Sequence, residues 1–339
     1  MIHGHSNELC YASKIRADFS ANTWYQGMHE ELFTVLKNSI SNIINYPEPD
    51  ASGLKENIAG YYQINARNVI VTNGSTEAFY LIAQAFAGAK SVVICPSFSE
   101  YNDACQMHRH QIVHLKNNPG WQNLKFENRL VWFANPNNPD GRTITLNEIM
   151  GSLQNNPSSV FVLDEAYIDL CYGIETAIPL LAEYSNLIIV RSFTKTFSIP
   201  GLRLGFMISS GKITNIIKSL LMPWNVNSLA IDAGDYIMKH YDRLLPDKAM
   251  IREESLTFQK ELGKNRKLIV YPSSCNFFMV QLLVGSAREL KKFLLDEFGV
   301  LIKNASNFTE LDKSFFRISV QEPEKNKLLI KAIKCWLQL

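Results

Sequence analysis

Several features that define common protein classes are missing from the sequence. The six cysteines (Cys10, Cys95, Cys105, Cys171, Cys275 and Cys335) include no C-x-x-C pair. We therefore expect neither a metal site nor a disulfide framework, but reduced thiols in a cytoplasmic protein. No apolar run reaches the ~20 residues of a membrane helix, and residues 1–22 lack the apolar core of a signal peptide. A net charge of +2, without blocks of like charge, gives no indication of a nucleic-acid or membrane partner.

Glycine-rich nucleotide-binding motifs are also missing. Neither G-x-G-x-x-G nor G-x-x-x-x-G-K-[ST] occurs, which disfavours a nicotinamide-dependent oxidoreductase and excludes a P-loop. The sequence instead alternates helical stretches with short, β-branched apolar runs at residues 68–72, 91–95, 111–115, 130–134, 160–164 and 186–190. Such alternation predicts an α/β fold with a mostly parallel central sheet.

The pattern of apolar and polar residues in the sequence changes near residue 240. Strand-like pieces then alternate with helical segments, and an amphipathic helix closes the chain. This pattern predicts a smaller α+β domain. We expect a large domain of residues 45–238 and a small domain formed by residues 1–44 together with residues 239–339.

Polar groups follow nearly every predicted strand. They are NGSTE (73–77), PSFSEY (96–101), NPNNPDG (135–141), DEAY (164–167) and SFTK (192–195). Ligands of open parallel sheets bind beyond the carboxyl ends of the strands. We therefore expect these segments to converge on one site.

Two of these segments have alternative interpretations. The NGSTE segment can bind an anion through the N–H groups at a helix start, although Ser or Thr there is also typical of an N-cap. In DEAY, Asp164 can serve as an ionised partner of a cationic ring nitrogen. The alternative is that Asp164 caps a helix and Glu165 is solvated.

The segment RSFTKTFSIPGLRLGF (191–206) is the most informative. A lysine after a strand is usually a surface residue, but Lys195 has a second cation, Arg203, close in sequence. A neighbouring positive charge and desolvation favour a neutral amine that can attack a carbonyl. Arg203 and the nearby hydroxyl groups suit a phosphate. A lysine nucleophile, a phosphate cradle and a carboxylate for a ring nitrogen together indicate pyridoxal 5′-phosphate (PLP).

With NGSTE, NPNNPDG, DEAYIDL and RSFTKTFSIPGLRLGF in this order, the chain resembles the class I/II aminotransferases of PLP fold type I. Within them it resembles the histidinol-phosphate aminotransferase branch and, more closely, the L-threonine-O-3-phosphate decarboxylases of cobalamin biosynthesis. The decarboxylase marks are HG (3–4), DFSAN (18–22), YPEPD (46–50) and MPWNVNSLA (222–230).

The resemblance implies a role for each matching cofactor residue. Lys195 would hold PLP as a Schiff base and move protons, and Asp164 would pair with the ring nitrogen. Tyr167 and Asn138 would bind the phenolic oxygen, and Phe98 would stack on the ring. The phosphate would be bound by Gly74, Ser75, Thr76, Ser192, Thr194 and Arg203. Tyr46 would reach the same phosphate from a second subunit, which implies a homodimer.

The resemblance also implies substrate residues for an amino acid or amino-phosphate. Arg317 would bind the α-carboxylate with Asn22 nearby, although an arginine on a strand is more often simply solvated. His3 and Gly4 would meet a substrate phosphate, or belong to a free terminal tail.

The chain departs from the decarboxylase pattern at several positions. His5 stands where the usual motif is HGG, TWYQG follows DFSAN, and Asp140 stands in NPDG where NPTG is usual. Gln321 occupies the region where a further basic residue is expected. These departures concern the substrate phosphate and leave the cofactor residues intact.

The residues leave the reaction open between decarboxylation and transamination, because both use every cofactor residue named. A PLP-binding sensor without turnover is a further alternative, but no DNA-binding segment is apparent.

Overall fold

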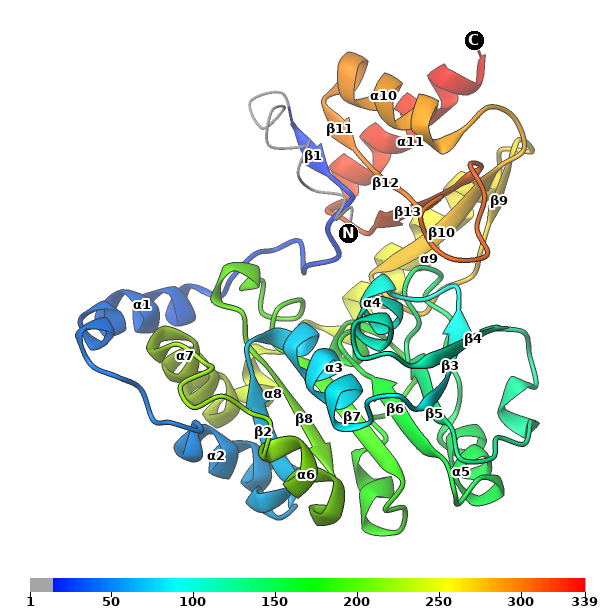
Figure 1. The fold of residues 1–339 in the computed structure, drawn as a ribbon. Helices are drawn as coiled ribbons and strands as arrows, with labels where there is room; N and C mark the ends of the chain where they lie inside the picture. Colours follow the sequence, from blue (N-terminus) through cyan, green and yellow to red (C-terminus); the bar gives the residue numbers. More distant parts are fainter. Residues whose placement is uncertain (1–14, 339) are drawn as a thin grey trace.

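The computed structural model describes residues 15–338, and its centre is a seven-stranded sheet (Figure 1). The strand order is β2 (Val69–Thr72), β8 (Gly205–Ser209), β7 (Leu187–Ser192), β6 (Val160–Asp164), β5 (Leu130–Ala134), β3 (Lys90–Cys95) and β4 (Gln111–Lys116). All six predicted strands are present. Strand β8, which the sequence did not indicate, is antiparallel to both β2 and β7, and the other pairs are parallel.

Helices cover both faces of this sheet, as the apolar strands require. Successive side chains along each strand pack into different cores on the two faces of the sheet. Ile70 of β2 and Trp132 of β5 lie in one core, and Val71 of β2 and Val131 of β5 lie in the other. The first face is covered by α3 (Gly74–Ala85), α4 (Ser99–Met107) and α6 (Gly211–Lys218). The second is covered by α2 (Ser52–Tyr62), α5 (Leu146–Asn155), α7 (Ser228–Lys239) and α8 (Tyr241–Leu244).

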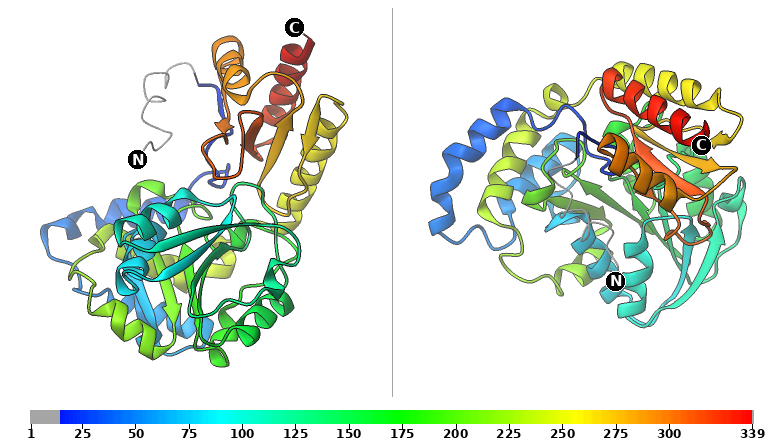
Figure 2. Two further views of the ribbon diagram at one scale, coloured as in Figure 1. Left: turned by 45° about the vertical axis from the view of Figure 1, so that its right-hand side comes forward. Right: turned by 90° about the horizontal axis from the view of Figure 1, so that it is seen from above.

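A second body stands beyond the carboxyl ends of the parallel strands (Figures 1 and 2). Its antiparallel sheet has the order β12 (Lys303–Asn304), β13 (Phe315–Ser319), β10 (Phe277–Leu282) and β9 (Leu268–Val270). The helices beside it are α9 (Lys248–Gly263), α10 (Ala287–Phe298) and α11 (Pro323–Gln338). Strand β1 (Ala17–Asp18) pairs in parallel with β11 (Val300–Leu301). These elements share a core that is separate from the two cores of the large sheet.

The N-terminal segment contributes to both bodies. Ala17 and Phe19 lie in the core of the smaller body, whereas Leu32 of α1 (Glu30–Ser39) lies in a core of the large sheet. Helix α1 packs against α7 and continues as a 3-10 helix over Ile40–Ile44. The division into residues 45–238 and the remainder stays a prediction. Over residues 15–338, no helix has both the length and the apolar character needed to span a bilayer.

Candidate active site

A small pocket lies at the carboxyl ends of the central strands, below the smaller body. Its volume is about 190 Å³. It is lined by Ser75, Thr76, Phe98, Asn138, Asp164, Ala166, Tyr167, Ser192, Thr194, Lys195 and Arg203. The structure therefore brings together ten of the predicted cofactor residues, from segments more than 100 residues apart in sequence.

The loop between β7 and β8 brings Lys195 and Arg203 to the pocket. The loop is compact: the Ile199 N–H donates to the Thr194 carbonyl at 3.2 Å, and the Lys195 carbonyl accepts from the Trp24 N–H at 2.9 Å. Lys195 is half-buried, so the surface interpretation of this lysine does not hold. The N-terminal segment thus helps to fix the backbone at Lys195.

The start of α3 is an uncapped helix N-terminus beside a cation. Its N-cap residue, Asn73, makes no side-chain capping bond, and Ser75 and Thr76 lie inside the first turn. The N-cap interpretation of these two residues is therefore wrong. Backbone N–H groups of a first turn, together with Arg203, fit a phosphate group.

Gly74 is required at this point for two reasons. Its φ is +78°, and a Cβ atom there would lie 2.4 Å from Nη2 of Arg203. Gly205 is similarly constrained, because its Cβ atom would lie 2.7 Å from the backbone nitrogen of Ser75. Only glycine allows the helix start and the arginine to approach this closely.

Asp164, at the end of β6, is buried and hydrogen-bonded through both oxygens. Oδ1 accepts from the Ala166 N–H at 2.8 Å, and Oδ2 accepts from the Tyr101 hydroxyl at 2.5 Å. Burial raises the pKa of Asp164 to about 6, although both hydrogen bonds act in the opposite direction. A cationic ring nitrogen in the pocket would favour the ionised carboxylate.

Glu165 is buried, so the alternative in which it is solvated is wrong. Its carboxylate accepts from Nη1 of Arg191 at 3.3 Å and from the Ala177 N–H at 2.7 Å. Nη2 of Arg191 donates to Asp169 at 2.9 Å. This ion-pair cluster lies beside the pocket and links β6 and β7 to the segment after Tyr167.

Aromatic and amide groups complete the pocket. Phe98 stands immediately before α4. The Tyr167 ring packs edge-on against Phe277 of the smaller body, with centroids 4.9 Å apart. Asn138 accepts a hydrogen bond from Nη1 of Arg317 at 2.6 Å.

Arg317, on β13, is only 7% exposed, so the alternative in which this arginine is solvated is wrong. Nη2 donates to the Ser20 carbonyl at 2.7 Å. Burial lowers the pKa of Arg317. Within residues 15–338, no partner is found for Nε of Arg317 or for either side-chain polar atom of buried Asn22. Buried polar atoms are normally satisfied, so these groups suit a polar ligand or water.

Among the predicted site residues within 15–338, Gly74, Asn22, Arg317 and Tyr46 do not line this pocket. Tyr46 is 85% exposed and packs against Trp224, with centroids 5.3 Å apart, at a separate surface hollow. His3 and Gly4 lie outside the described residues. Gln321 donates to the Asp18 carbonyl and to Ser319, both at 3.1 Å, and so serves the smaller body internally.

Sequence reasoning missed Tyr101. It contacts Asp164 from α4, and the only signal was its place three residues after Phe98 in PSFSEY. That spacing puts two side chains on one side of a first helical turn, but it does not identify the carboxylate they approach.

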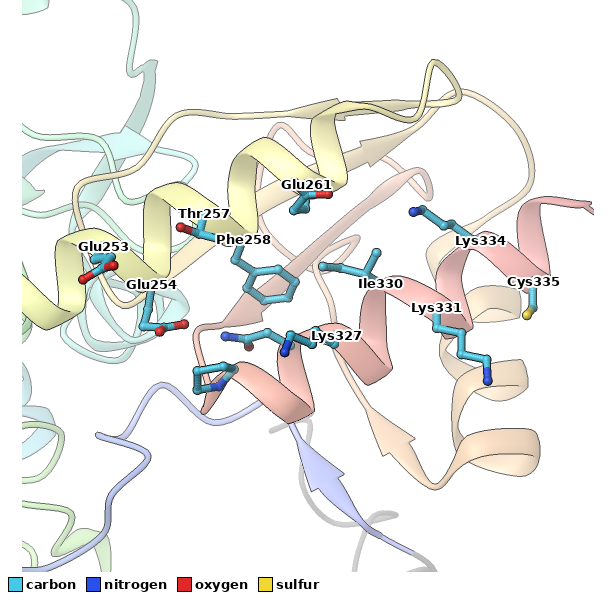
Figure 3. Close-up of a pocket in the computed structure, with 12 residues that line it drawn as sticks. Glu253, Glu254, Thr257, Phe258, Glu261, Lys327, Ile330, Lys331, Lys334 and Cys335 are labelled. Carbon is cyan, nitrogen blue, oxygen red and sulfur yellow. The ribbon is translucent and has the colours of Figure 1, made fainter.

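A larger groove of about 690 Å³ lies between α9 and α11 (Figure 3). Phe258 and Ile330 form apolar parts of its lining, glutamates line it from α9 and lysines from α11. It contains none of the predicted site residues. The small pocket, with its convergent polar groups, is therefore the candidate active site.

Comparisons with known proteins agree with this geometry. The pattern of the family "Aminotransferase class I and II" matches residues 9–333. The chain is 31% identical to a histidinol-phosphate aminotransferase of Caldanaerobacter subterraneus subsp. tengcongensis, over 85% of this chain and 83% of the relative. It is 28% identical to the threonine-phosphate decarboxylase of Salmonella typhimurium, over 94% of this chain and 90% of the relative.

A solved structure is also very similar. The crystal structure of L-threonine-O-3-phosphate decarboxylase from Porphyromonas gingivalis superposes with a TM-score of 0.93. It shares 36% identity, and the match covers 95% of this chain and 100% of the other. The chain belongs to the class I and II aminotransferase family, whose enzymes depend on PLP.

Proposed function

We propose that this protein is a PLP-dependent decarboxylase of an amino acid that carries a phosphate, most like L-threonine O-3-phosphate. The observation that carries the proposal is the close similarity, over nearly the whole chain, to a solved decarboxylase of that compound. Burial of Arg317 beside the pocket supports an anionic amino-acid substrate. A location in the cytoplasm stays a prediction from the sequence.

The cofactor residues act as a unit in this proposal. PLP, when bound, supplies an electron sink for the charge that develops on the substrate α-carbon. The Lys195 amine holds the cofactor and afterwards accepts or returns a proton. Asp164, as an ionised carboxylate, would pair with the protonated ring nitrogen, and Arg203 with the α3 N-terminus would bind the phosphate.

Arg317 would orient the substrate. Its guanidinium would bind the α-carboxylate and so limit how the α-carbon is presented to PLP. Its hydrogen bond to Asn138 connects this carboxylate contact to the residue predicted to bind the phenolic oxygen.

The second candidate function is a histidinol-phosphate-type aminotransferase that transfers an amino group to 2-oxoglutarate. The 31% identity to such an enzyme favours it. The deciding experiment offers L-threonine O-3-phosphate and histidinol phosphate separately, each with 2-oxoglutarate, and follows carbon dioxide and glutamate in parallel. Carbon dioxide release without glutamate supports the decarboxylase. Glutamate formation without carbon dioxide would overturn it, and Lys195→Ala should abolish either product.

We further propose that the protein is a homodimer in which Tyr46 completes the partner's phosphate site. Apolar side chains in the same surface hollow as Tyr46 are unusually exposed: Ile44 is 82% exposed, Ile43 61% and Trp224 48%. Exposed apolar patches of this kind are typical of protein interfaces. A second copy of the chain is the occupant that the family resemblance implies.

Mixed dimers test this arrangement. A Tyr46→Ala chain paired with a Lys195→Ala chain contains one intact site if Tyr46 acts across the interface. Such a dimer should recover about half of the wild-type activity, whereas each variant alone stays impaired. If Tyr46 acts within its own chain, no intact site exists and mixing restores nothing.

A further inference from the structure

Tyr101 contacts the site through its hydroxyl group, and the sequence did not predict this residue. Tyr101 is 1% exposed and lies behind Asp164, on α4. It donates to Oδ2 of Asp164 at 2.5 Å. Tyr101 itself does not line the pocket.

The ring of Tyr101 has little freedom to move. It stacks on Trp132 at an interplanar angle of 21°, and Phe79 and Phe98 approach it edge-on. The centroid distances to these three rings are 6.0, 4.9 and 6.0 Å, respectively. Because aromatic neighbours surround the ring, they fix the position of its hydroxyl group. The hydroxyl is held within hydrogen-bonding distance of the Asp164 carboxylate.

The carboxylate of Asp164 has few other sources of stabilisation. In the described part of the chain, none of the ion pairs includes Asp164. The nearest acidic group, Glu165, opposes its ionisation but is itself paired with Arg191. The other ionisable groups around the same pocket are Lys195, Tyr167 and Arg203. Two neutral donors, the Tyr101 hydroxyl and the Ala166 N–H, therefore hold the carboxylate.

We propose that Tyr101 is a positioning residue for Asp164, which keeps the carboxylate ionised and fixes its plane toward the ring nitrogen of PLP. A dry site favours the neutral pair, in which the proton leaves the ring nitrogen for the carboxylate. A hydroxyl that donates to the carboxylate lowers its basicity and leaves the proton on the ring. The ring then stays an effective electron sink. This inference needs PLP binding only and does not depend on which substrate reacts.

The test compares wild type with Tyr101→Phe, which keeps the ring and removes only the hydroxyl. The first measurement is the ¹⁵N NMR signal of the ring nitrogen in holoenzyme loaded with ¹⁵N-labelled PLP. We expect the signal of the variant to move toward that of the unprotonated ring. The second measurement is the dissociation constant of PLP, which we expect to rise about tenfold, equivalent to about 1.4 kcal/mol.

Two further variants separate positioning from a general structural effect. Tyr80→Phe also removes a tyrosine hydroxyl bonded to a carboxylate, that of Glu100 at 3.1 Å, but Tyr80 does not line the pocket. It should leave both measurements at wild-type values. In an Asp164→Asn background, Tyr101→Phe should have no further effect on PLP affinity, because asparagine carries no negative charge for the hydroxyl to stabilise.

An unchanged ring-nitrogen signal in folded Tyr101→Phe holoenzyme would overturn the inference. Equal loss of PLP affinity with aspartate or asparagine at position 164 would also overturn it. Neither measurement involves substrate, so failure here leaves the decarboxylase proposal untouched. Failure of the carbon dioxide assay likewise leaves this inference standing.

Discussion

Gly74→Ala should separate cofactor binding from folding at the start of α3. The new methyl group would lie 2.4 Å from Nη2 of Arg203, so one of the two must move. The guanidinium is the end of a flexible side chain and can turn away from the methyl group. It would then turn away from the predicted phosphate position as well.

The expected magnitudes follow from two independent terms. A non-glycine residue at φ +78° costs about 1 kcal/mol of stability. Loss of a hydrogen bond between a guanidinium and a phosphate costs about 1.5–3 kcal/mol. The dissociation constant of PLP should therefore rise about 10- to 150-fold. The stability of the apoprotein should fall only by the cost of the left-handed backbone conformation.

Gly88→Ala is a matched control. Gly88 has a φ of +76°, and a Cβ atom there would find nothing within 4 Å. Both variants should lower the melting temperature of the apoprotein similarly, but only Gly74→Ala should weaken PLP, measured by titration of its absorption. If both bind PLP like wild type, Arg203 does not contribute to the phosphate site as inferred.

The remaining predictions concern buried charge and ring contact. Arg191→Met should destabilise the protein by about 3–5 kcal/mol, because it leaves Glu165 and Asp169 buried without their cation. In urea unfolding, Arg243→Met, which breaks the exposed pair with Glu31, should cost much less stability than Arg191→Met, and equal losses would contradict this. Since burial raises the pKa of Asp164 from 3.8 to about 6, the native apoprotein holds that proton more tightly than the unfolded chain. The wild-type apoprotein should therefore lose up to about 3 kcal/mol relative to Asp164→Asn as pH rises between these values, and parallel stability curves would refute the assignment. Phe98→Ala should weaken PLP binding by removing the ring contact, whereas Phe98→Tyr should retain it. Titration of PLP measures both, and equal affinity of the two variants would count against stacking.

Local sequence patterns predicted the strands well because a strand buried on both faces needs a continuous apolar run. They did not indicate β8, since its five residues, Gly205–Ser209, follow directly on the motif that carries Lys195 and Arg203. Residues 28–44 have helical apolar spacing throughout, but α1 ends at Ser39 and a 3-10 helix follows. Ile43 and Ile44 are exposed in the single chain. Helical apolar spacing indicates that one face of a helix is buried, but it does not indicate whether the same chain or another chain buries that face.

The polar contacts of the site were less predictable. Chain order places Asp164 at a strand end, but the aromatic residue that meets it comes from a helix 63 positions earlier. The sequence offered a solvated Glu165 as one alternative, whereas the structure pairs it with Arg191, a residue of the next strand. Such pairs depend on strand register, which local patterns do not specify.

The antiparallel direction of β8 limits how the chain between residues 192 and 205 can vary in length. Both stems of this connection are strands inside the sheet, paired with each other from Ile188–Ser209 to Ser192–Gly205. An added or deleted residue cannot be absorbed by sliding either stem, because a one-residue slip would reverse its two faces. Insertions should therefore be excluded from this connection in functional variants and tolerated in outer loops such as the one after β4.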